Sequence, residues 1–333
     1  MNNFNNLSGV QLLLKNRLTA HDLTKEVEYL ISNFLVIGSL NMIYAKAGIG
    51  KSFFTLSLAL ALIKNSLVKN CIYMDADNSL TAIKSRGIDK IIEEYPELLY
   101  IHSSKLDVSP QQTLITLSDD AKKNSGSFEG TLIIFDSIRD FIGGDMNSDR
   151  DIIKIMQQLK DLREAGATVI YLHHTTKDTH DSETPIFKGS TSFLDSVDCA
   201  FALSSKRNEN RLNFQLHVSK DRLSVEDCAF ELDTTTMTLQ SENIKIANMT
   251  EYEAEFVNTV KIHLDFWGDD GVKQSQLLKK IGKSSDDKTA RKYLQKFNGE
   301  FWEIQKRPQE NNATYYFPLS EPNSPHLPNS LSA

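Results

Sequence analysis

The residues best suited to chemistry lie in one short run that holds two glycines, a lysine and a serine. It reads Ala45-Lys46-Ala47-Gly48-Ile49-Gly50-Lys51-Ser52, with Phe53 next. The spacing fits G-x-x-x-x-G-K-[ST], a loop that binds nucleotide phosphates, except that Ala45 replaces the first glycine. Gly48 and Gly50 would let successive backbone amides face the phosphates at a helix N-terminus. Lys51 would neutralise the β- and γ-phosphates and Ser52 would offer its hydroxyl to Mg²⁺, so we expect residues 45–53 to bind ATP with Mg²⁺.

An aspartate at the end of an apolar run is a candidate for the second metal-side contact. The run reads Thr131-Leu132-Ile133-Ile134-Phe135-Asp136-Ser137. Open parallel sheets bind ligands at the carboxyl ends of their strands, so a buried strand here would place Asp136 beside the phosphate loop. Ser52 and Asp136 are therefore the expected metal-side residues.

Hydrolysis also needs a group that orients the attacking water, and carboxylates follow another apolar run. That run ends Tyr73-Met74-Asp75-Ala76-Asp77-Asn78. With the phosphate loop, it resembles the RecA superfamily, in which a glutamate at the position of Asp77 acts on the water. Aspartate is one methylene shorter than glutamate. Asp77 could act through a different water position, Asp75 could substitute for it, or turnover could be slow.

Two further segments resemble the RepA-type plasmid helicases and their relatives within that superfamily. They are Asp136-Ser137-Ile138-Arg139-Asp140-Phe141 and Leu172-His173-His174-Thr175-Thr176-Lys177. In those proteins, a histidine after the fourth core strand senses the γ-phosphate and couples it to a DNA-binding loop. His173 and His174 map there, with a purely structural histidine pair as the alternative.

A glycine- and serine-containing segment is similar to one that follows the mobile DNA loop of RecA-like and DnaB-like motors. It reads Phe187-Lys188-Gly189-Ser190-Thr191-Ser192-Phe193-Leu194-Asp195-Ser196-Val197-Asp198. The polar residues 177–185 before it have the composition of such a loop. The resemblance makes Lys188 the candidate for a DNA phosphate contact there.

A lysine and an arginine follow the strand pattern of residues 212–218, in the run Ser219-Lys220-Asp221-Arg222. This run resembles the element with which DnaB-like rings insert a lysine and an arginine into the neighbour's ATP. A cation supplied in trans stabilises charge that develops on the transferred phosphoryl group. The resemblance implies a homo-oligomeric ring, expected to be a hexamer, that couples ATP hydrolysis to translocation on or unwinding of DNA in plasmid- or phage-type replication. Single-stranded DNA is its expected partner.

Lys46 supports a different interpretation of the same loop. The run Lys-x-Gly-x-Gly-Lys-Ser resembles the deviant loop of ParA/MinD-type switches, in which this lysine reaches across a dimer to the partner's nucleotide. Ala47 stands where that family has glycine. The histidine pair and the Ser-Lys-x-Arg element, which the switches lack, favour the motor.

These residues need a parallel sheet to bring them together. From residue 40 to about residue 204, short apolar runs alternate with amphipathic stretches, which predicts an α/β fold: a RecA-like parallel sheet with helices on both faces. Ser148 and Asp151 would cap one helix, and residues 211–240 predict strands and hairpins. The expected strands are Leu40–Ala45, Cys71–Asp75, Leu98–His102, Thr131–Asp136, Thr168–His173 and Val197–Leu203.

Beyond residue 250 the pattern changes to three helices and a β-hairpin, which is typical of a winged helix. The helices are expected at residues 256–264, at 276–281 and after a Ser284-x-x-Asp287 cap, and the strands at 301–305 and 314–317. The predicted organisation is an N-terminal extension (1–30), a RecA-like ATPase domain (31–245), a winged-helix domain (250–317) and a disordered tail (318–333).

Charge is unevenly distributed along the chain. The net charge is −7, yet residues 273–307 hold ten lysines and arginines against four acidic residues. A basic island on an acidic chain favours a polyanionic partner. The third helix would enter the major groove of duplex DNA and the wing would contact phosphates, so a nucleotide-dependent DNA-binding regulator of a mobile element is the alternative to a motor. The candidate contacts are Lys288, Arg291, Lys292, Lys296, Lys306 and Arg307.

Composition limits the class of protein. The 333 residues are 40% hydrophobic and 24% charged, which excludes collagen-like repeats and a disordered chain. No apolar run approaches the roughly 20 residues that span a bilayer, and no export signal is visible. Three widely spaced cysteines indicate reduced thiols rather than a disulfide framework. We therefore expect a cytoplasmic protein with no membrane partner.

Overall fold

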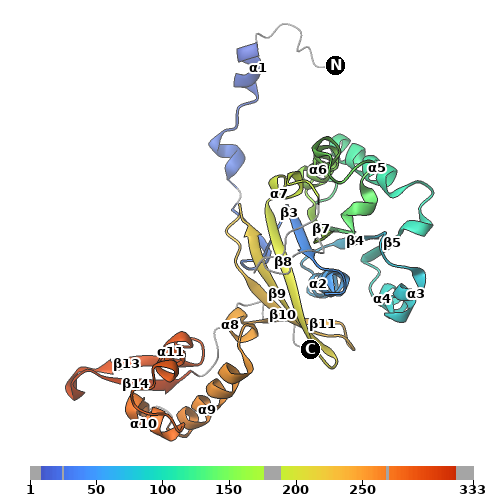
Figure 1. Cartoon of the computed structure of the whole chain (residues 1–333). Helices are drawn as coiled ribbons and strands as arrows, with labels where there is room; N and C mark the ends of the chain where they lie inside the picture. The colour runs from blue at the N-terminus through green and yellow to red at the C-terminus, as the bar shows by residue number, and fades with distance from the viewer. Residues whose placement is uncertain (1–8, 25, 176–188, 268–269, 320–333) are drawn as a thin grey trace.

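A nine-stranded sheet forms the centre of the chain, whose computed structural model describes residues 9–24, 26–175, 189–267 and 270–319 (Figure 1). The strand order is β11-β10-β9-β8-β3-β7-β6-β4-β5; the strands from β8 to β5 are parallel, and β9, β10 and β11 add antiparallel pairs. This is the predicted RecA-like α/β architecture. The strands are β3 Leu40–Ala45, β4 Asn70–Asp75, β5 Leu98–His102, β6 Thr131–Asp136, β7 Thr168–His174, β8 Cys199–Asn208, β9 Arg211–Lys220, β10 Cys228–Asp233 and β11 Thr238–Glu242.

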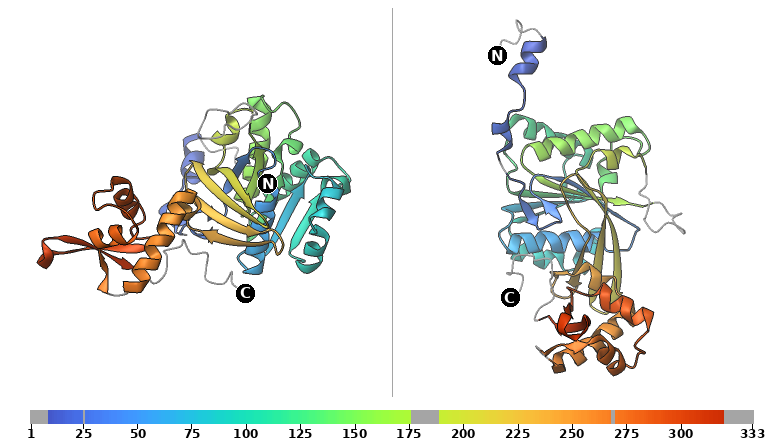
Figure 2. Two further views of the ribbon diagram at one scale, coloured as in Figure 1. Left: turned by 60° about the horizontal axis from the view of Figure 1, so that its bottom comes forward. Right: turned by 90° about the vertical axis from the view of Figure 1, so that its left-hand side faces the viewer.

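Helices cover both faces of the sheet, and each face has its own apolar core (Figure 2). One face packs against α2 (Lys51–Lys64), α3 (Leu80–Ser85) and α4 (Ile88–Glu94); the other packs against α5 (Pro110–Lys123), α6 (Asp149–Glu164) and α7 (Ser192–Asp195). Half of the predicted capping box of α6 is confirmed, because the Ser148 side chain accepts a hydrogen bond from the Asp151 amide. The other half is wrong, because the Asp151 carboxylate accepts from the Asp145 amide instead of the Ser148 amide. In the described part of the chain, no helix is both long enough and apolar enough to cross a membrane.

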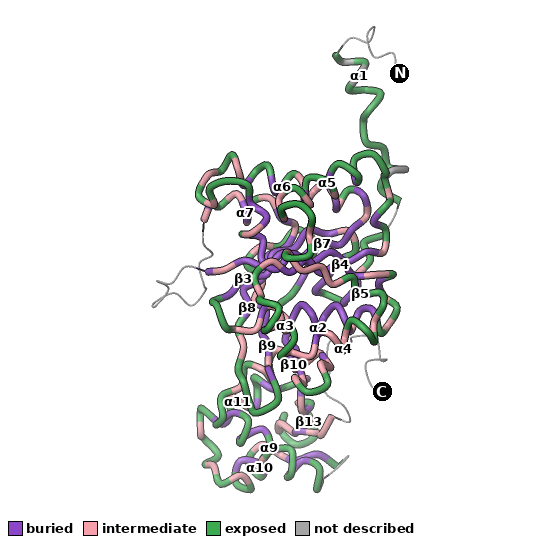
Figure 3. The backbone as a smooth tube through the Cα atoms, turned by 90° about the vertical axis from the view of Figure 1, so that its right-hand side faces the viewer, coloured by how far each residue is buried: buried purple, intermediate pink, exposed green. Residues whose placement is uncertain are grey.

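The strands β3 and β6 are buried along their whole length, as parallel strands between two helical layers must be. Figure 3 shows the buried residues concentrated in the central sheet. Their register decides which residues meet at the carboxyl edge. Ala45 of β3 pairs with His174 of β7, and Asp75 of β4 pairs with Asp136 of β6. The phosphate loop, both histidines and the candidate carboxylates are therefore brought to one edge.

The N-terminal segment extends away from the body as α1 (Gly9–Lys15) and a 3₁₀ turn, η1 (Ala20–Leu23) (Figure 1). It joins the body at a small hairpin of β1 (Tyr29–Ile31) and β2 (Leu35–Val36). The Tyr29 hydroxyl donates a hydrogen bond to the Leu223 carbonyl. This contact ties the hairpin to the segment that follows β9.

The C-terminal unit has its own apolar core and contains the predicted three helices and hairpin. A two-residue strand, β12, was not predicted, and it pairs with β14 to make a three-stranded sheet. The elements are α8 (Ile244–Ala247), α9 (Glu251–Trp267), β12 (Val272–Lys273), α10 (Gln274–Lys280), α11 (Lys288–Lys296), β13 (Trp302–Arg307), η5 (Pro308–Glu310) and β14 (Ala313–Pro318).

Two details of this unit correct the sequence prediction. The cap of α11 is Asp287, whose side chain accepts from the Ala290 amide, whereas the Ser284 hydroxyl bonds to Asp286. Aspartate is itself a strong N-cap, so the helix starts three residues later than predicted. Pro318, expected to begin the tail, ends β14 opposite Trp302; residues 320–333 lie outside the described chain.

Candidate active site

The phosphate loop connects β3 to α2, and two glycines give it its shape. Gly48 and Gly50 have φ values of +82° and +98°, a backbone region that residues with a side chain rarely adopt. A Cβ at Gly50 would also lie 3.3 Å from the Phe214 ring of β9. From β8, the Ser205 hydroxyl donates to the Ile49 carbonyl at 2.6 Å. The neighbouring strands β8 and β9 therefore support the loop.

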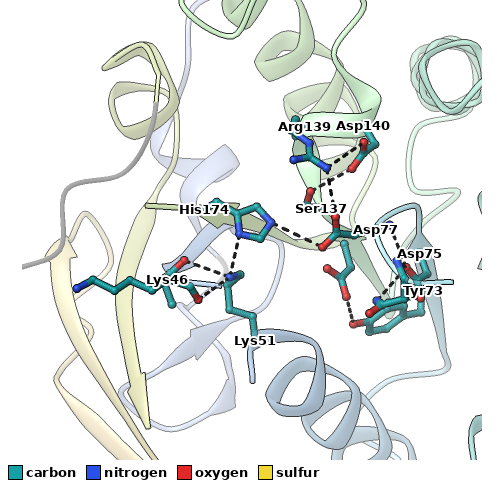
Figure 4. Close-up of polar contacts among 12 residues, drawn as sticks. Lys46, Lys51, Tyr73, Asp75, Asp77, Ser137, Arg139, Asp140 and His174 are labelled. Carbon is teal, nitrogen blue, oxygen red and sulfur yellow. Dashed lines mark hydrogen bonds and ion pairs between the residues drawn. The ribbon is translucent and has the colours of Figure 1, made fainter. Parts of the chain in front are cut away.

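Lys51 is 7% exposed and its ammonium lies against the loop's own main chain. Its Nζ donates to the carbonyls of Ala45 at 3.1 Å and Lys46 at 3.2 Å, and lies 3.3 Å from His174 Nδ1 (Figure 4). Burial lowers the pKa of Lys51, and the charges of Asp136 and Asp77 only partly oppose this. An anionic ligand beside Nζ would therefore stabilise the charged form strongly.

Asp136 lies at the end of β6, 2% exposed, and its carboxylate accepts two hydroxyl hydrogen bonds. Tyr73 donates at 2.9 Å from the neighbouring strand, and Ser52 donates from the start of α2. Burial raises the pKa of Asp136 to about 6, and the charges of Asp75 and Asp77 add to the rise.

A divalent cation fits this arrangement. A hydroxyl and a carboxylate in contact are the oxygen donors with which proteins hold Mg²⁺ when substrate phosphates supply further ligands. Among the described residues, no group of three or more His, Cys, Asp or Glu side chains could hold a metal by itself. The residues present therefore fit a metal that arrives with a nucleotide, and Ser52 and Asp136 are the residues that would contact it.

The two candidate water-positioning carboxylates differ in what they contact. Asp75 is 1% exposed and accepts hydrogen bonds from the amides of Asp77 and Asn78 and from the Tyr100 hydroxyl. It stabilises the turn after β4. Asp77 projects from that turn toward His174 and Arg139, with 31% of its side chain exposed (Figure 4). The geometry therefore favours Asp77 over Asp75 as the residue that reaches the space beside Lys51 and His174, called the cleft from here on.

Only one of the two adjacent histidines faces this cleft. His173 is 1% exposed and its ring packs edge-on against Phe193, with the centroids 4.5 Å apart. His174 lies between Lys51 and Asp77, with Nε2 at 3.7 Å from Asp77 Oδ2. Side chains alternate between the two faces of a strand, so the sequence pair could supply only one residue to the site.

Three residues at this edge were missed as site residues by the sequence interpretation: Tyr73, Tyr100 and Arg139. Tyr73 and Tyr100 stack at 5.1 Å and donate to Asp136 and Asp75, respectively. Arg139 Nη2 lies 3.3 Å from Asp77 Oδ1. Tyr73 and Tyr100 each lie two residues before the end of an apolar run, in β4 and β5. This position could have indicated the two tyrosines, because a buried hydroxyl needs a hydrogen-bond partner and a strand-ending aspartate nearby can supply one.

The remaining ATP-site candidates lie apart from this cluster. The Lys46 side chain is exposed and points away from Lys51 (Figure 4). Lys220 Nζ donates to the carbonyls of Leu194 and Asp195 at 2.6 and 2.8 Å, and Arg222 donates to Asp195 at 3.3 Å. Lys188, the predicted DNA contact, and the predicted loop of residues 177–185 lie outside the described residues.

The six basic residues expected to contact DNA divide into two groups. Lys296 pairs with Glu253 at 2.7 Å, Arg291 donates to the Ser285 carbonyl, and the Arg307 guanidinium lies 3.9 Å from the centre of the Tyr315 ring. Lys288 and Lys292 are exposed four residues apart on α11, and Lys306 is exposed on β13. The second group presents its charge to solvent.

Comparison with known proteins adds one finding. A family model described as an AAA domain matches residues 13–180, half of the 333 residues. The match contains the phosphate loop, Asp77, Asp136 and both histidines. No curated protein matches the chain.

Proposed function

Because the chain belongs to the AAA domain family, a family of P-loop ATPases, we propose that it hydrolyses ATP with Mg²⁺ in a site completed by a second copy. We further propose that it is a ring-forming motor, similar to the RepA-type and DnaB-like helicases, that moves along single-stranded DNA. A hexamer is the expected assembly.

The position of Lys220 and Arg222 carries the shared-site proposal. Both cations bind main-chain carbonyls at the end of α7, whereas Lys51, Asp77, Asp136 and His174 gather at the carboxyl edge of the sheet. If these cations act on ATP, a neighbouring copy has to receive them. A trans cation of this kind is worth roughly 10³- to 10⁵-fold in turnover in related phosphoryl-transfer enzymes.

Within one chain, each cleft residue has a role that its surroundings support. Lys51 would bind the β- and γ-phosphates, and Ser52 and Asp136 would hold the metal side. The bound Mg²⁺ would neutralise charge on the phosphate oxygens. Asp77 would orient water, and His174, in contact with both Lys51 and Asp77, would report the γ-phosphate. His173, buried against Phe193, would keep a structural role.

A subunit-mixing experiment tests the shared site. Arg222→Ala removes the cation given to the neighbour, and Asp77→Asn removes the water-orienting charge in the subunit's own cleft. Each variant alone should lose roughly 100-fold or more in turnover. In an equal mixture that exchanges subunits, about one quarter of the interfaces pair two intact halves, so turnover should recover toward about one quarter of wild type.

Light scattering with an ATP analogue, with and without single-stranded DNA, measures the assembly. Co-purification of an untagged variant with an affinity-tagged one shows that mixed oligomers form. Mixed oligomers with no recovery would contradict a shared site. A strictly monomeric preparation that turns over ATP at the full rate would contradict it equally.

A second candidate function is a nucleotide-dependent regulator that binds duplex DNA without motor activity. The exposed charges of Lys288 and Lys292 on α11 favour it, because they lie on the helix that a winged-helix protein places in the major groove. Strand displacement on a tailed duplex distinguishes the two candidates: a motor displaces the strand with ATP, and a regulator does not.

A further inference from the structure

Asp77 is held at both of its carboxylate oxygens by two different elements. Oδ1 lies 3.3 Å from Arg139 Nη2, and Oδ2 lies 3.7 Å from His174 Nε2 (Figure 4). The turn that carries Asp77 is itself fixed by Asp75, which accepts from the Asp77 amide at 3.2 Å. With the main chain fixed, the rotation of the carboxylate depends on these two side-chain partners.

Arg139 approaches from a well-supported turn. It belongs to η3 (Ile138–Phe141), which follows Asp136 directly, and Phe141 of that turn packs edge-on against Phe135 of β6. Gln111 of α5 donates to the main-chain carbonyls of Asp140 and Ile142 at 3.0 and 3.3 Å. The guanidinium thus extends toward Asp77 from a main chain that two neighbouring elements stabilise.

A second carboxylate fixes the guanidinium itself. Arg139 Nη2 lies 3.6 Å from Asp140 Oδ1, and the Ser137 hydroxyl donates to Asp140 Oδ2 at 3.2 Å. The contacts form a chain from Asp77 through Arg139 and Asp140 to Ser137. Ser137 is the residue after Asp136, so this chain connects the carboxylate beside the cleft to the segment that follows the metal-side residue.

We propose that Arg139 is a positioning residue that sets the direction of the Asp77 carboxylate toward the attacking water. This inference rests on the proposed ATP hydrolysis and assigns a function to a residue outside the phosphate-binding set. Without Arg139, Oδ1 loses its partner and the carboxylate can rotate about its bond to Cβ. A displacement of about 1 Å at a catalytic group costs up to about 100-fold in rate.

The electrostatic surroundings of Asp77 favour an ionised carboxylate, which can orient water, over a protonated carboxyl group. The contact with His174 lowers the pKa of Asp77, with smaller contributions from the charges of Arg139 and Lys51, and partial burial only partly opposes them. Asp77 therefore stays ionised at neutral pH. An ionised, fixed carboxylate accepts a hydrogen bond from water along a defined direction.

Steady-state and single-turnover ATPase kinetics on the full chain test this role. Arg139→Ala should lower kcat roughly 10- to 100-fold and leave KM for ATP within about twofold, because ground-state binding is untouched. Arg139→Lys, which keeps a cation within reach of Asp77, should recover most of that loss. In an Asp77→Asn background, Arg139→Ala should change the rate by less than about twofold, since the carboxylate it positions is gone.

Arg211→Ala is the matched control, since Arg211 is an exposed arginine paired with Glu231 at 2.6 Å. It should leave both kinetic constants unchanged. Since the Arg139 side chain is half exposed, the variant should fold, and Arg139→Gln provides the same cycle with a bulkier side chain.

The inference is overturned if Arg139→Ala turns over ATP like wild type, or if it loses the same factor in the Asp77→Asn background. A raised KM with unchanged kcat would also overturn it, by making Arg139 a nucleotide-binding residue. An inactive wild-type chain would instead remove the proposed hydrolysis, and this inference with it; active wild type with unaffected Arg139 variants removes the inference alone.

Discussion

Charged side chains are buried both at the carboxyl edge of the central sheet and in the C-terminal unit, but their surroundings affect their pKa values differently. At the carboxyl edge of the central sheet, burial lowers the pKa of Lys51 and raises that of Asp136 to about 6. In the C-terminal unit, the hydrogen bond with Lys296 at 2.7 Å lowers the pKa of Glu253 although the glutamate is only 6% exposed. Burial is the largest influence on the pKa values in the first region, and the hydrogen bond with Lys296 is the largest influence on the pKa of Glu253 in the second.

This difference distinguishes charged groups that stabilise the folded chain from charged groups that are suited to bind a ligand. A pair that favours the charged forms adds to the free energy of unfolding, whereas a charge that burial disfavours subtracts from it. Proteins retain the second kind chiefly where a ligand later supplies the missing partner. The contrast therefore agrees with the position that the phosphate-loop motif indicates for the nucleotide.

The largest effect that can break this comparison is on turnover. Lys51→Ala should lower ATP turnover at least roughly 1,000-fold, because the only ammonium that contacts both the phosphate-loop carbonyls and His174 in the described chain is removed. The thermal midpoint should not fall, since a buried charge is removed together with its desolvation cost. A phosphate-release assay and a thermal scan measure the two properties.

Lys46→Ala is the paired variant, and near-normal turnover is expected because this exposed side chain points away from the cleft (Figure 4). Loss of turnover in Lys46→Ala would favour the switch-type mechanism. Full turnover in Lys51→Ala would show that the buried ammonium serves the fold alone.

The next effect concerns stability against pH in nucleotide-free protein with a chelator present. A rise in the pKa of Asp136 from about 4 to about 6 corresponds to roughly 3 kcal/mol at pH 7 or above. The native state prefers the protonated acid, so the wild type is favoured below pH 4 and loses stability as the pH rises through 6. Asp136→Asn should therefore be more stable than wild type at pH 8 and lose that advantage by pH 4.

Calorimetric unfolding across this pH range measures the difference, and Asp107→Asn at an exposed site is the control, expected to stay within about 0.5 kcal/mol of wild type. An Asp136→Asn variant that is less stable than wild type at pH 8 would mean that the native state favours the charged aspartate.

The same contrast explains which parts of the molecule could be predicted from sequence. The strands that carry Ala45, Asp75 and Asp136 were predicted nearly to the residue, because an apolar run between helical patterns is a local signal. That these ends share one edge followed from the rule for parallel strands. The phosphate loop needed no more than its spacing and its flanking elements.

The partners of the buried charges depend on which strands are neighbours, and that is not local. Tyr73 meets Asp136 because β4 lies beside β6, which chain order does not reveal. Arg139 meets Asp77 across the same pair of strand ends. In the C-terminal unit, the choice of Asp287 over Ser284 as cap was missed because both residues are competent caps, and their spacing alone does not select between them.

A smaller effect is expected where the C-terminal unit presents unpaired charge. On the proposal that α11 binds duplex DNA, Lys288→Ala with Lys292→Ala should weaken that binding roughly 10-fold at physiological salt and reduce the salt slope by about 2, whatever the DNA sequence. Lys296→Ala should weaken binding less, because its charge is already paired with Glu253. Fluorescence anisotropy over a salt series measures both; equal losses would mean that pairing within the chain does not decide which cations reach DNA.

The smallest effect tests the pairing itself. Glu253→Gln keeps the hydrogen-bond acceptor for Thr250 but removes the charge opposite Lys296, so the C-terminal unit should lose about 1 kcal/mol at pH 7. Because the pKa of Glu253 is lowered on folding, this stabilisation is present above about pH 4.3 and disappears as the pH falls further, the opposite sign to Asp136. Both tryptophans of the chain, Trp267 and Trp302, lie in this unit, so tryptophan fluorescence during urea unfolding follows it separately from the sheet domain. If Glu253→Gln instead stabilises this unit at pH 7, the two regions hold their charges in the same way, and the contrast no longer marks the nucleotide site.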